Sequence, residues 1–294
     1  MTEKNFEHKE NIEKITSKID LRFFRHGEKE PSVSGKPDEE IQLTEKGRGQ
    51  AIKKTEDEDI SQSLAFGSSR KRAQQTAGLV MAGKLDEITG NESLDELKQK
   101  LNKGLKEGGS KISIDNRLNY NVDLSTEFGK KYLEAFKNGV FLKFVVEQSD
   151  SLAKSFNEIE TDNYSRMAGQ IAEVVKKYIG IATHWDALVK DEGKQYKDTL
   201  KRFLGTHQGV AECFLLKVVE KTKGENERNE LITALNNVGF DFTEGFDVDI
   251  ENTSDGKREV RIIFKKEKDG KTIFKYDEIV PEEVIDSIIK EKNN

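Results

Sequence analysis

The residues best suited to chemistry in this chain are Arg25, His26 and Gly27, which directly follow an apolar run at residues 19–24. The run predicts a strand, and ligands of open α/β sheets bind outside the carboxyl ends of the strands. The guanidinium of Arg25 offers a fork of donors shaped for phosphate, and a glycine lets backbone approach a ligand closely. The triplet therefore indicates phosphate chemistry on His26.

Two other segments place polar residues at the ends of short predicted strands. The strand at 64–67 leads into Ser68 and Ser69 and a helix over about 70–81 that carries Arg72. The strand at 203–206 ends at His207, and a helical pattern follows over 209–219. Strand ends of one sheet can meet, so we expect these groups to converge. Ser68 or Ser69 could donate a hydroxyl to a ligand, but capping the helix is the favoured role.

A neutral imidazole can attack phosphorus directly and form a covalent phosphohistidine, which divides one difficult displacement into two easier ones. The reaction also requires that the phosphoryl group be positioned and that the charge on its oxygens be neutralised. Arg25, Arg72 and His207 could supply both. This scheme requires no metal and no cofactor. A lone histidine at position 26 or 207 would instead be a hydrogen-bonded structural residue.

Taken together, the segments resemble the histidine phosphatase superfamily, which contains the phosphoglycerate mutases. The resemblance runs over about 19–77 and again over about 204–216, and it rests on four motifs: Arg25-His26-Gly27, Leu43-Thr44-x-x-Gly47, Arg72-Ala73-x-x-Thr76-Ala77 and Thr206-His207-x-Gly209. It implies that His26 is the nucleophile and that Arg25, Arg72 and His207 complete a phosphate pocket. Gly27, Arg70 and Glu212 are expected to contribute to substrate binding.

The chain departs from the family pattern at the proton donor. In mutase-like members a glutamate follows an Arg-Leu-Asn stretch, whereas Tyr120 follows residues 117–119 here. Asp123 or Glu127 is our predicted acid, with Glu212 and Glu28 as other candidates. The departure argues against a phosphoglycerate mutase and favours a phosphatase.

Composition sets further limits. Charged residues make up 35% of the 294 residues, the net charge is −6, and Lys and Glu are interspersed, so no nucleic-acid partner is expected. The single cysteine, Cys213, excludes an internal disulfide and a cysteine-built metal site. No run approaches the length of a membrane span and no signal-peptide pattern opens the chain, so we expect a cytoplasmic protein without membrane contacts.

The predicted fold is α/β, a three-layer α/β/α arrangement around a mostly parallel sheet. We expect one domain over 1–294, with a helical insert within 84–200 forming a cap over the pocket. Residues 222–294 should form an antiparallel meander with Asp-Gly turns, closed by a helix near 281–290. Oligomers could form through these C-terminal strands, since edge strands can pair with another chain.

The sequence thus predicts a metal-independent phosphatase that hydrolyses a phosphomonoester on a small molecule or a phosphoprotein. A non-catalytic module that binds phosphate or phosphoprotein is the alternative, because the expected acid is missing. A mutase-type phosphotransferase is a weaker third interpretation.

Overall fold

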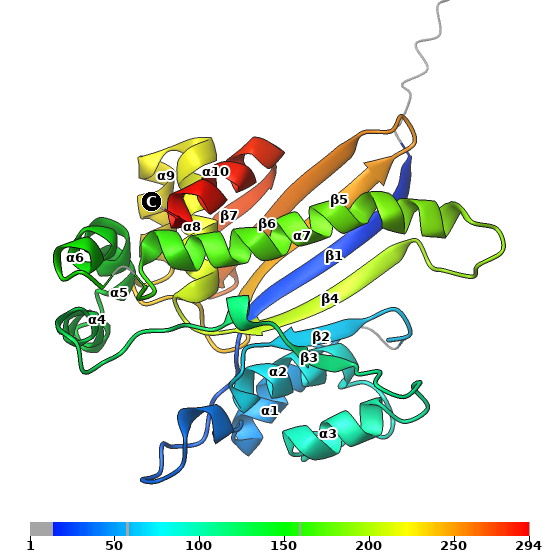
Figure 1. Cartoon of the computed structure of the whole chain (residues 1–294), viewed down its shortest axis with the longest axis horizontal. Helices are drawn as coiled ribbons and strands as arrows, with labels where there is room; N and C mark the ends of the chain where they lie inside the picture. Colours follow the sequence, from blue (N-terminus) through cyan, green and yellow to red (C-terminus); the bar gives the residue numbers. More distant parts are fainter. Residues whose placement is uncertain (1–13, 57–58, 159, 294) are drawn as a thin grey trace, which may run out of the picture.

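The computed structural model describes residues 14–56, 59–158 and 160–293 (Figure 1). Residues 1–13 of the predicted polar lead-in lie outside this part, and its last residues, from Ile15, already belong to the first strand. The described strands form one sheet in the order β3-β2-β4-β1-β5-β6-β7. Their bounds are β1 Ile15–Arg25, β2 Leu64–Gly67, β3 Ile112–Ile114, β4 Thr199–Thr206, β5 Gly245–Thr253, β6 Arg258–Lys268 and β7 Lys271–Ile279.

Half of this sheet is parallel. The pairs β3–β2, β2–β4 and β4–β1 all run in the same direction. Side chains of β1 alternate between its two faces, as a strand requires. Leu21 and Phe23 join one core cluster, and Phe24 joins the other. Both faces of the parallel half are therefore covered, as is usual for parallel strands.

The other half is the predicted C-terminal meander, which continues the same sheet. β5 pairs antiparallel with β1, and β6 and β7 follow as hairpins. The β6–β7 turn has Asp269 at φ 52° and Gly270 at φ 73°, two consecutive left-handed residues of a tight hairpin turn. The described sheet is thus mixed, with its parallel strands on one side of β1 and its antiparallel strands on the other.

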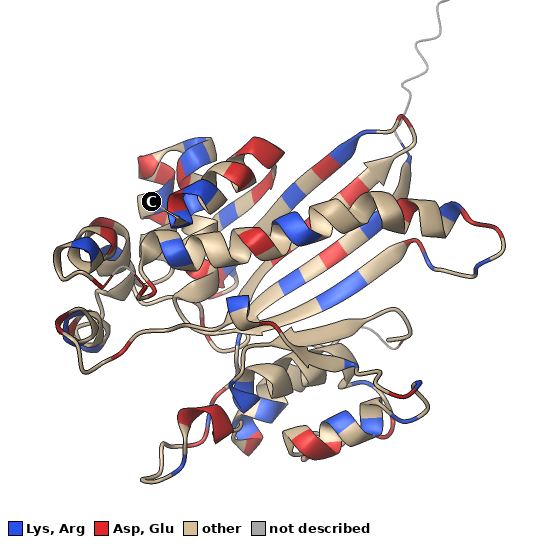
Figure 2. Ribbon diagram, viewed as in Figure 1, with Lys and Arg blue, Asp and Glu red and all other residues tan. Residues whose placement is uncertain are grey.

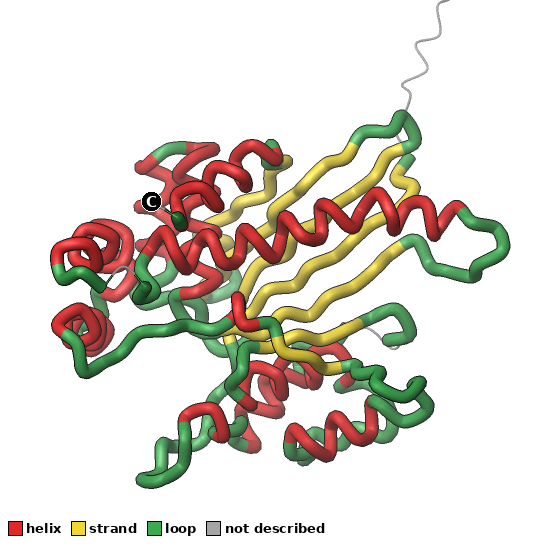
Figure 3. The backbone as a smooth tube through the Cα atoms, viewed as in Figure 1, coloured by secondary structure: helices red, strands yellow, loops and turns green. Residues whose placement is uncertain are grey.

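The helices lie on both faces of the sheet. Figures 1 and 3 show α7 crossing one face and α1, α2 and α3 gathered on the opposite side. The α-helices are α1 Glu45–Ile52, α2 Lys71–Ala82, α3 Leu94–Leu101, α4 Glu127–Lys137, α5 Phe141–Phe144, α6 Asp150–Ser155, α7 Tyr164–Lys190, α8 Val210–Lys223, α9 Glu225–Ala234 and α10 Glu282–Lys292. Short helical turns complete the set, η1 Asp38–Glu40, η2 Asn116–Leu118 and η3 Val145–Ser149. The predicted three-layer α/β/α fold is confirmed.

Much of the segment 84–200 belongs to the sheet and its layers. α3 packs on α2, β3 is an outer strand of the sheet, and α7 packs on β1 and β5. In Figure 1 the helices α4, α5 and α6 stand together beyond the ends of β1 and β4. A cap can therefore be proposed only for the part between η2 and α7.

Charges are distributed without a single-sign stripe in the view of Figure 2, where Lys and Arg alternate with Asp and Glu along the strands and helices. Among the described residues, no helix combines the length and the apolar character needed to cross a membrane.

Candidate active site

Strand register places the two histidines side by side. β1 and β4 are parallel with Arg25 opposite Thr206, so His26 and His207 are the next residues at the carboxyl ends of both strands. The backbone N–H of His26 donates to the carbonyl of Thr206 at 3.0 Å. The two imidazole rings meet edge to face, with centroids 5.2 Å apart. The structure thus brings two of the predicted site residues together.

The side chain of His26 is held in one tautomer. Its Nδ1 lies 2.7 Å from the carbonyl oxygen of Gly27. A carbonyl oxygen only accepts, so in a neutral ring Nδ1 carries the proton and Nε2 keeps its lone pair. Nε2 faces Arg72, whose Nε donates to it at 3.4 Å. The lone pair of His26 is therefore directed toward the cationic side chain expected to hold phosphate.

His26 is also kept uncharged. The residue is only 7% exposed. Burial, with the nearby charges of Arg72 and Arg25, lowers the pKa of His26 to about 3. A protonated imidazole cannot attack phosphorus, so this shift preserves the nucleophilic form well below neutral pH.

The arginine of the first motif projects toward the same place. Arg25 donates from Nη1 to the carbonyl of Phe240 at 2.6 Å, and its guanidinium lies 4.4 Å from the ring centre of Phe242. Its Nε is buried and has no hydrogen-bond partner among the described residues. A buried unpaired donor beside a nucleophile is a natural place for a phosphoryl oxygen.

His207 is buried and anchored on one side only. Its Nε2 lies 2.7 Å from Oγ of Ser68, the residue that directly follows β2. Its Nδ1 is buried and, within the described part of the chain, lacks a hydrogen-bond partner. Burial and the neighbouring His26 and Arg72 lower the pKa of His207. Ser68 also accepts a hydrogen bond from the N–H of Arg70, and it positions His207. No side chain caps the start of α2, so the predicted capping role of Ser68 is wrong.

Arg70 and Arg72 share one carboxylate that sequence analysis did not single out. Asp38 Oδ2 accepts from Arg70 Nε at 2.6 Å and from Arg72 Nη2 at 2.8 Å. Partial burial acts to raise the pKa of Asp38, but the bonds from Arg72 and Arg70 outweigh it and lower the pKa to about 2. Asp38 is therefore ionised and unsuited to donate a proton. Asp38 begins η1, 34 residues before Arg72, and no local sequence pattern marks it.

The glycines of the first two motifs pack on each other. A Cβ on Gly27 would stand 2.5 Å from the carbonyl oxygen of Gly47, and one on Gly47 would overlap the carbonyl oxygen of Glu28. Gly27 also donates from its N–H to Oγ1 of Thr76 at 3.1 Å. Gly27 is thus required by the crossing of two backbone segments, which differs from the expected approach to a ligand.

The two predicted acids lie outside the cluster. Asp123 is exposed and accepts from the N–H and Oγ of Ser125, which lower its pKa. Glu127 begins α4, is exposed and pairs with Lys130, which lowers its pKa. Both carboxylates are occupied by local contacts, and the structure does not bring them to His26.

The other carboxylates considered also serve the scaffold. Glu212 is fully buried and accepts from the N–H groups of Gly209 and Phe240, both at 2.8 Å. Burial raises the pKa of Glu212 to about 7. It therefore supports the start of α8 and the turn that contacts Arg25, one layer behind the pocket. Glu28 pairs with Lys46 at 2.7 Å.

The two histidines and the two arginines Arg25 and Arg72 line a cavity of about 430 Å³. Its lining residues are Arg25, His26, Lys29, Arg72, Tyr120, Leu124, Tyr132, Leu133, Phe136, His207, Gln208 and Phe242. The cationic and imidazole groups come from the strand ends and α2. The apolar and aromatic groups come from the 119–126 loop, from α4 and from the turn before β5. None of the lining residues is Asp or Glu. Tyr120 packs edge to face on His207, with centroids 5.2 Å apart.

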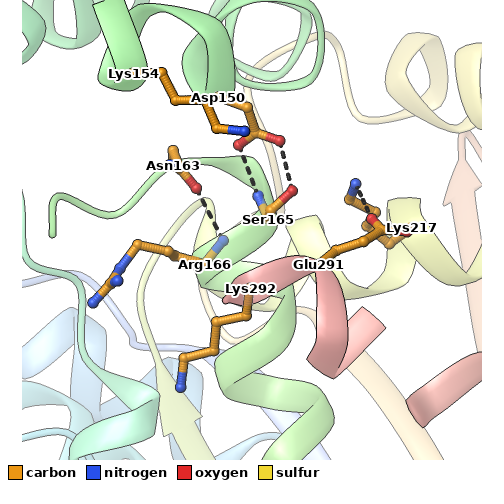
Figure 4. A pocket seen from close by; sticks show the side chains of 8 residues that line it. All are labelled: Asp150, Lys154, Asn163, Ser165, Arg166, Lys217, Glu291 and Lys292. Atoms are coloured by element: carbon orange, nitrogen blue, oxygen red, sulfur yellow. Dashed lines mark hydrogen bonds and ion pairs between the residues drawn. The ribbon is translucent and has the colours of Figure 1, made fainter. Parts of the chain in front are cut away.

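A second cavity, of about 310 Å³, lies between α6, α7, α8 and α10 (Figure 4). Its lining is polar, and Figure 4 shows Asp150 bonded to Ser165 and Lys217 paired with Glu291. Lys292 pairs with Glu173 at 2.6 Å. Lys217 and Lys292 are thus matched by carboxylates, so the cavity at His26 is the better candidate for an anionic ligand.

Comparison with known proteins is consistent with these motifs. Residues 21–116 match the model of the histidine phosphatase superfamily (branch 1). No curated protein sequence matches the chain.

Several solved structures are similar to the chain. One is titled mycobacterial hydrolase 1, with 14% identity, 90% of this chain and 96% of that chain covered, and a TM-score of 0.44. Another is the mycobacterial glucosyl-3-phosphoglycerate phosphatase, with 14% identity, 80% and 90% covered, and a TM-score of 0.42. A third is a phosphoserine phosphatase mutant of Entamoeba histolytica in complex with phosphoserine, with 13% identity, 80% and 95% covered, and a TM-score of 0.35.

The match over residues 21–116 agrees with the resemblance indicated by the motifs: the segment that supplies Arg25, His26 and Arg72 is similar to the histidine phosphatase superfamily (branch 1).

Proposed function

We propose that this protein is a phosphatase that hydrolyses a phosphomonoester through a covalent phosphohistidine on His26. The observation that carries the proposal is the fixed tautomer of His26, whose Nδ1 bonds to Gly27 while Nε2 faces Arg72. A purely structural histidine would not need its Nε2 lone pair directed at a guanidinium.

In the first step of the proposed reaction, Nε2 of His26 attacks phosphorus. The P–N bond forms while the bond from phosphorus to the ester oxygen breaks, and the leaving group departs with that electron pair. In the second step water attacks phosphorus, the P–N bond breaks, and phosphate leaves. The proton released by the water balances the negative charge of the departed alcohol. Arg25, Arg72 and His207 stabilise the phosphoryl oxygens in both steps.

A non-catalytic phosphate-binding module is the second candidate. One observation favours it, because Tyr120 occupies the sequence position expected for the acid, and binding alone needs no acid. The mutase-type interpretation is weaker, because mutase-like members have a glutamate at the position that Tyr120 occupies here.

Turnover separates the candidates. We expect the wild-type protein to hydrolyse an aryl phosphate in the presence of a metal chelator, and the His26→Ala variant to lose this activity. His184→Ala is the matched control, because His184 is exposed on α7 and its removal should leave the hydrolysis rate unchanged. Phosphate analogues that raise the melting temperature without any turnover would favour the binding module.

A further inference from the structure

We propose that the preferred substrate is an aryl phosphomonoester, meaning a phosphate on an aromatic hydroxyl such as a phenol or a tyrosine side chain. This inference rests on the proposed phosphatase function and names its substrate class. Two separate observations carry it: the apolar mouth of the cavity and the absence of a carboxylic acid from its lining.

The mouth offers aromatic and aliphatic surface to whatever is attached to the phosphate. The ring centre of Phe242 lies 6.4 Å from that of His26. Phe136 on α4 and Leu124 on the loop before it are 41% and 48% exposed. Side chains of this kind bind an apolar group and cannot satisfy the hydroxyls of a sugar or of glycerol.

Two of the polar side chains near the mouth already have partners. Gln208 uses its amide N–H on the carbonyl of Val238 at 2.7 Å. Lys29 lies 3.7 Å from Asp38 and 3.3 Å from Ser32. A polar leaving group would lose its bonds to water on entry and regain only some of them, which selects against it.

The chemistry of the leaving group points the same way. No Asp or Glu among the described residues lines the cavity, and Asp38, which bonds to Arg72 nearby, is held ionised by its two arginines. A general acid is worth a factor of about 10² to 10⁴ in rate. A phenol can leave as a phenolate with little help, because its hydroxyl has a pKa of about 10. An alkyl alcohol is a far poorer leaving group and needs that proton.

Three substrates separate the two observations: phenyl phosphate, cyclohexyl phosphate and glycerol phosphate, assayed with the wild-type protein. We expect KM for cyclohexyl phosphate to be about tenfold lower than for glycerol phosphate, because only the former suits an apolar mouth. We expect kcat for phenyl phosphate to exceed kcat for cyclohexyl phosphate by about 100-fold or more, because no acid protonates the leaving oxygen. Equal kcat/KM for phenyl and glycerol phosphate would overturn the inference.

A matched pair of variants tests the mouth itself. Phe136→Ala should raise KM for phenyl phosphate several-fold and leave KM for glycerol phosphate unchanged. Phe156→Ala is the control, because Phe156 is similarly exposed, at 39%, and ends α6 outside the cavity lining. A Phe136→Ala variant that changes both substrates equally would contradict a role in selecting the leaving group. Free phosphotyrosine and a phosphotyrosyl peptide, compared by kcat/KM, distinguish a small-molecule source of the aryl phosphate from a protein source.

A non-hydrolysable probe keeps this inference separable from the proposed function. If no phosphomonoester is turned over, the proposed function fails, and binding of phenylphosphonate and methylphosphonate can still be compared by calorimetry. Tighter binding of phenylphosphonate would uphold the aryl-selective site, and equal affinity would reject it.

Discussion

His26 is oriented by the backbone of its own neighbour. The carbonyl of Gly27 accepts a hydrogen bond from the Nδ1–H of His26 at 2.7 Å, so no separate carboxylate is needed to fix the ring. Arg72, from a different element, faces the other nitrogen. The positions of the proposed nucleophile, His26, and of its cationic partner, Arg72, are thus set by one local turn and one packing contact, both of which lie within short motifs.

The depressed pKa of His26 has a consequence for the pH dependence of activity. A folded-state pKa of about 3, below the ordinary value near 6.5, means that the ring stays neutral as pH falls through 6.5. Since kcat/KM reports the ionisation of the free enzyme, we expect no loss of kcat/KM near pH 6.5 once the substrate's own ionisation is corrected for. The measurement is a pH profile between pH 4 and 8. A decline with a midpoint at pH 6.5 would show an exposed, ordinary histidine.

Asp38 competes for the groups that should bind phosphate. Its carboxylate is bonded to both Arg70 and Arg72, and it is partly exposed. We expect Asp38→Asn to strengthen inhibition by inorganic phosphate, because a competing anion is removed. An ion pair of this exposure is worth about 1 kcal/mol or less, which limits the gain in affinity to about fivefold. Weaker inhibition would instead show that Asp38 aligns the arginines for phosphate.

The proton donor could not be located from the sequence alone. Asp123 and Glu127 follow the 117–119 stretch closely, yet their carboxylates turn to Ser125 and Lys130. Asp38 was not recognised because its contacts with Arg70 and Arg72 span more than 30 residues. Sequence proximity is a weak guide to side-chain direction in a loop, whereas residues at strand ends inherit their direction from the sheet.

At the scale of elements, the predictions succeeded where strand ends are marked locally. β2 was predicted with its observed bounds. The structure adds that Thr44 caps α1 by accepting from the N–H of Gly47 at 3.0 Å. α9 was missed because its sequence is mostly polar and shows little helical periodicity. β3 has three residues, too few for an alternating pattern.

α1 offers a matched test of the packing between the first two motifs. Gly47→Ala should destabilise the fold by about 1–3 kcal/mol, because its Cβ would overlap the backbone at Glu28. Gly49→Ala, two residues later in the same helix, meets nothing within 4 Å and should be stabilising by about 0.5–1 kcal/mol. Urea unfolding of both variants measures the two values. Equal effects would mean that helix propensity alone decides them.

At the scale of the whole molecule, the C-terminal quarter is part of the central sheet. β5 pairs with β1 along nearly its whole length, and α10 packs on α7. The sequence identified the meander, but its place beside β1 depends on long-range pairing that no local pattern encodes. Of the described strands, β7 and β3 have an unpaired edge, so our proposal of assembly through the C-terminal strands concerns the outer edge of β7.

A chain ending at Lys221 should therefore fail to fold. It would leave one edge of β1 unpaired and expose the face of α7 that α10 covers, including contacts with Ile285 and Ile288, which are fully buried in the intact chain. We expect the shortened chain to lose cooperative thermal unfolding, measured by circular dichroism, with the full chain as control. A shortened chain that unfolds cooperatively would show an independent domain before residue 222.

The most direct test of the proposed function is to trap the covalent intermediate. The protein is mixed with an aryl phosphate, quenched in alkali within milliseconds, and analysed by peptide mass spectrometry. We predict one phosphoryl group on the peptide containing His26, stable to base and labile to acid, and absent from His26→Ala. Turnover without any such adduct, or an adduct on another residue, would contradict nucleophilic catalysis by His26.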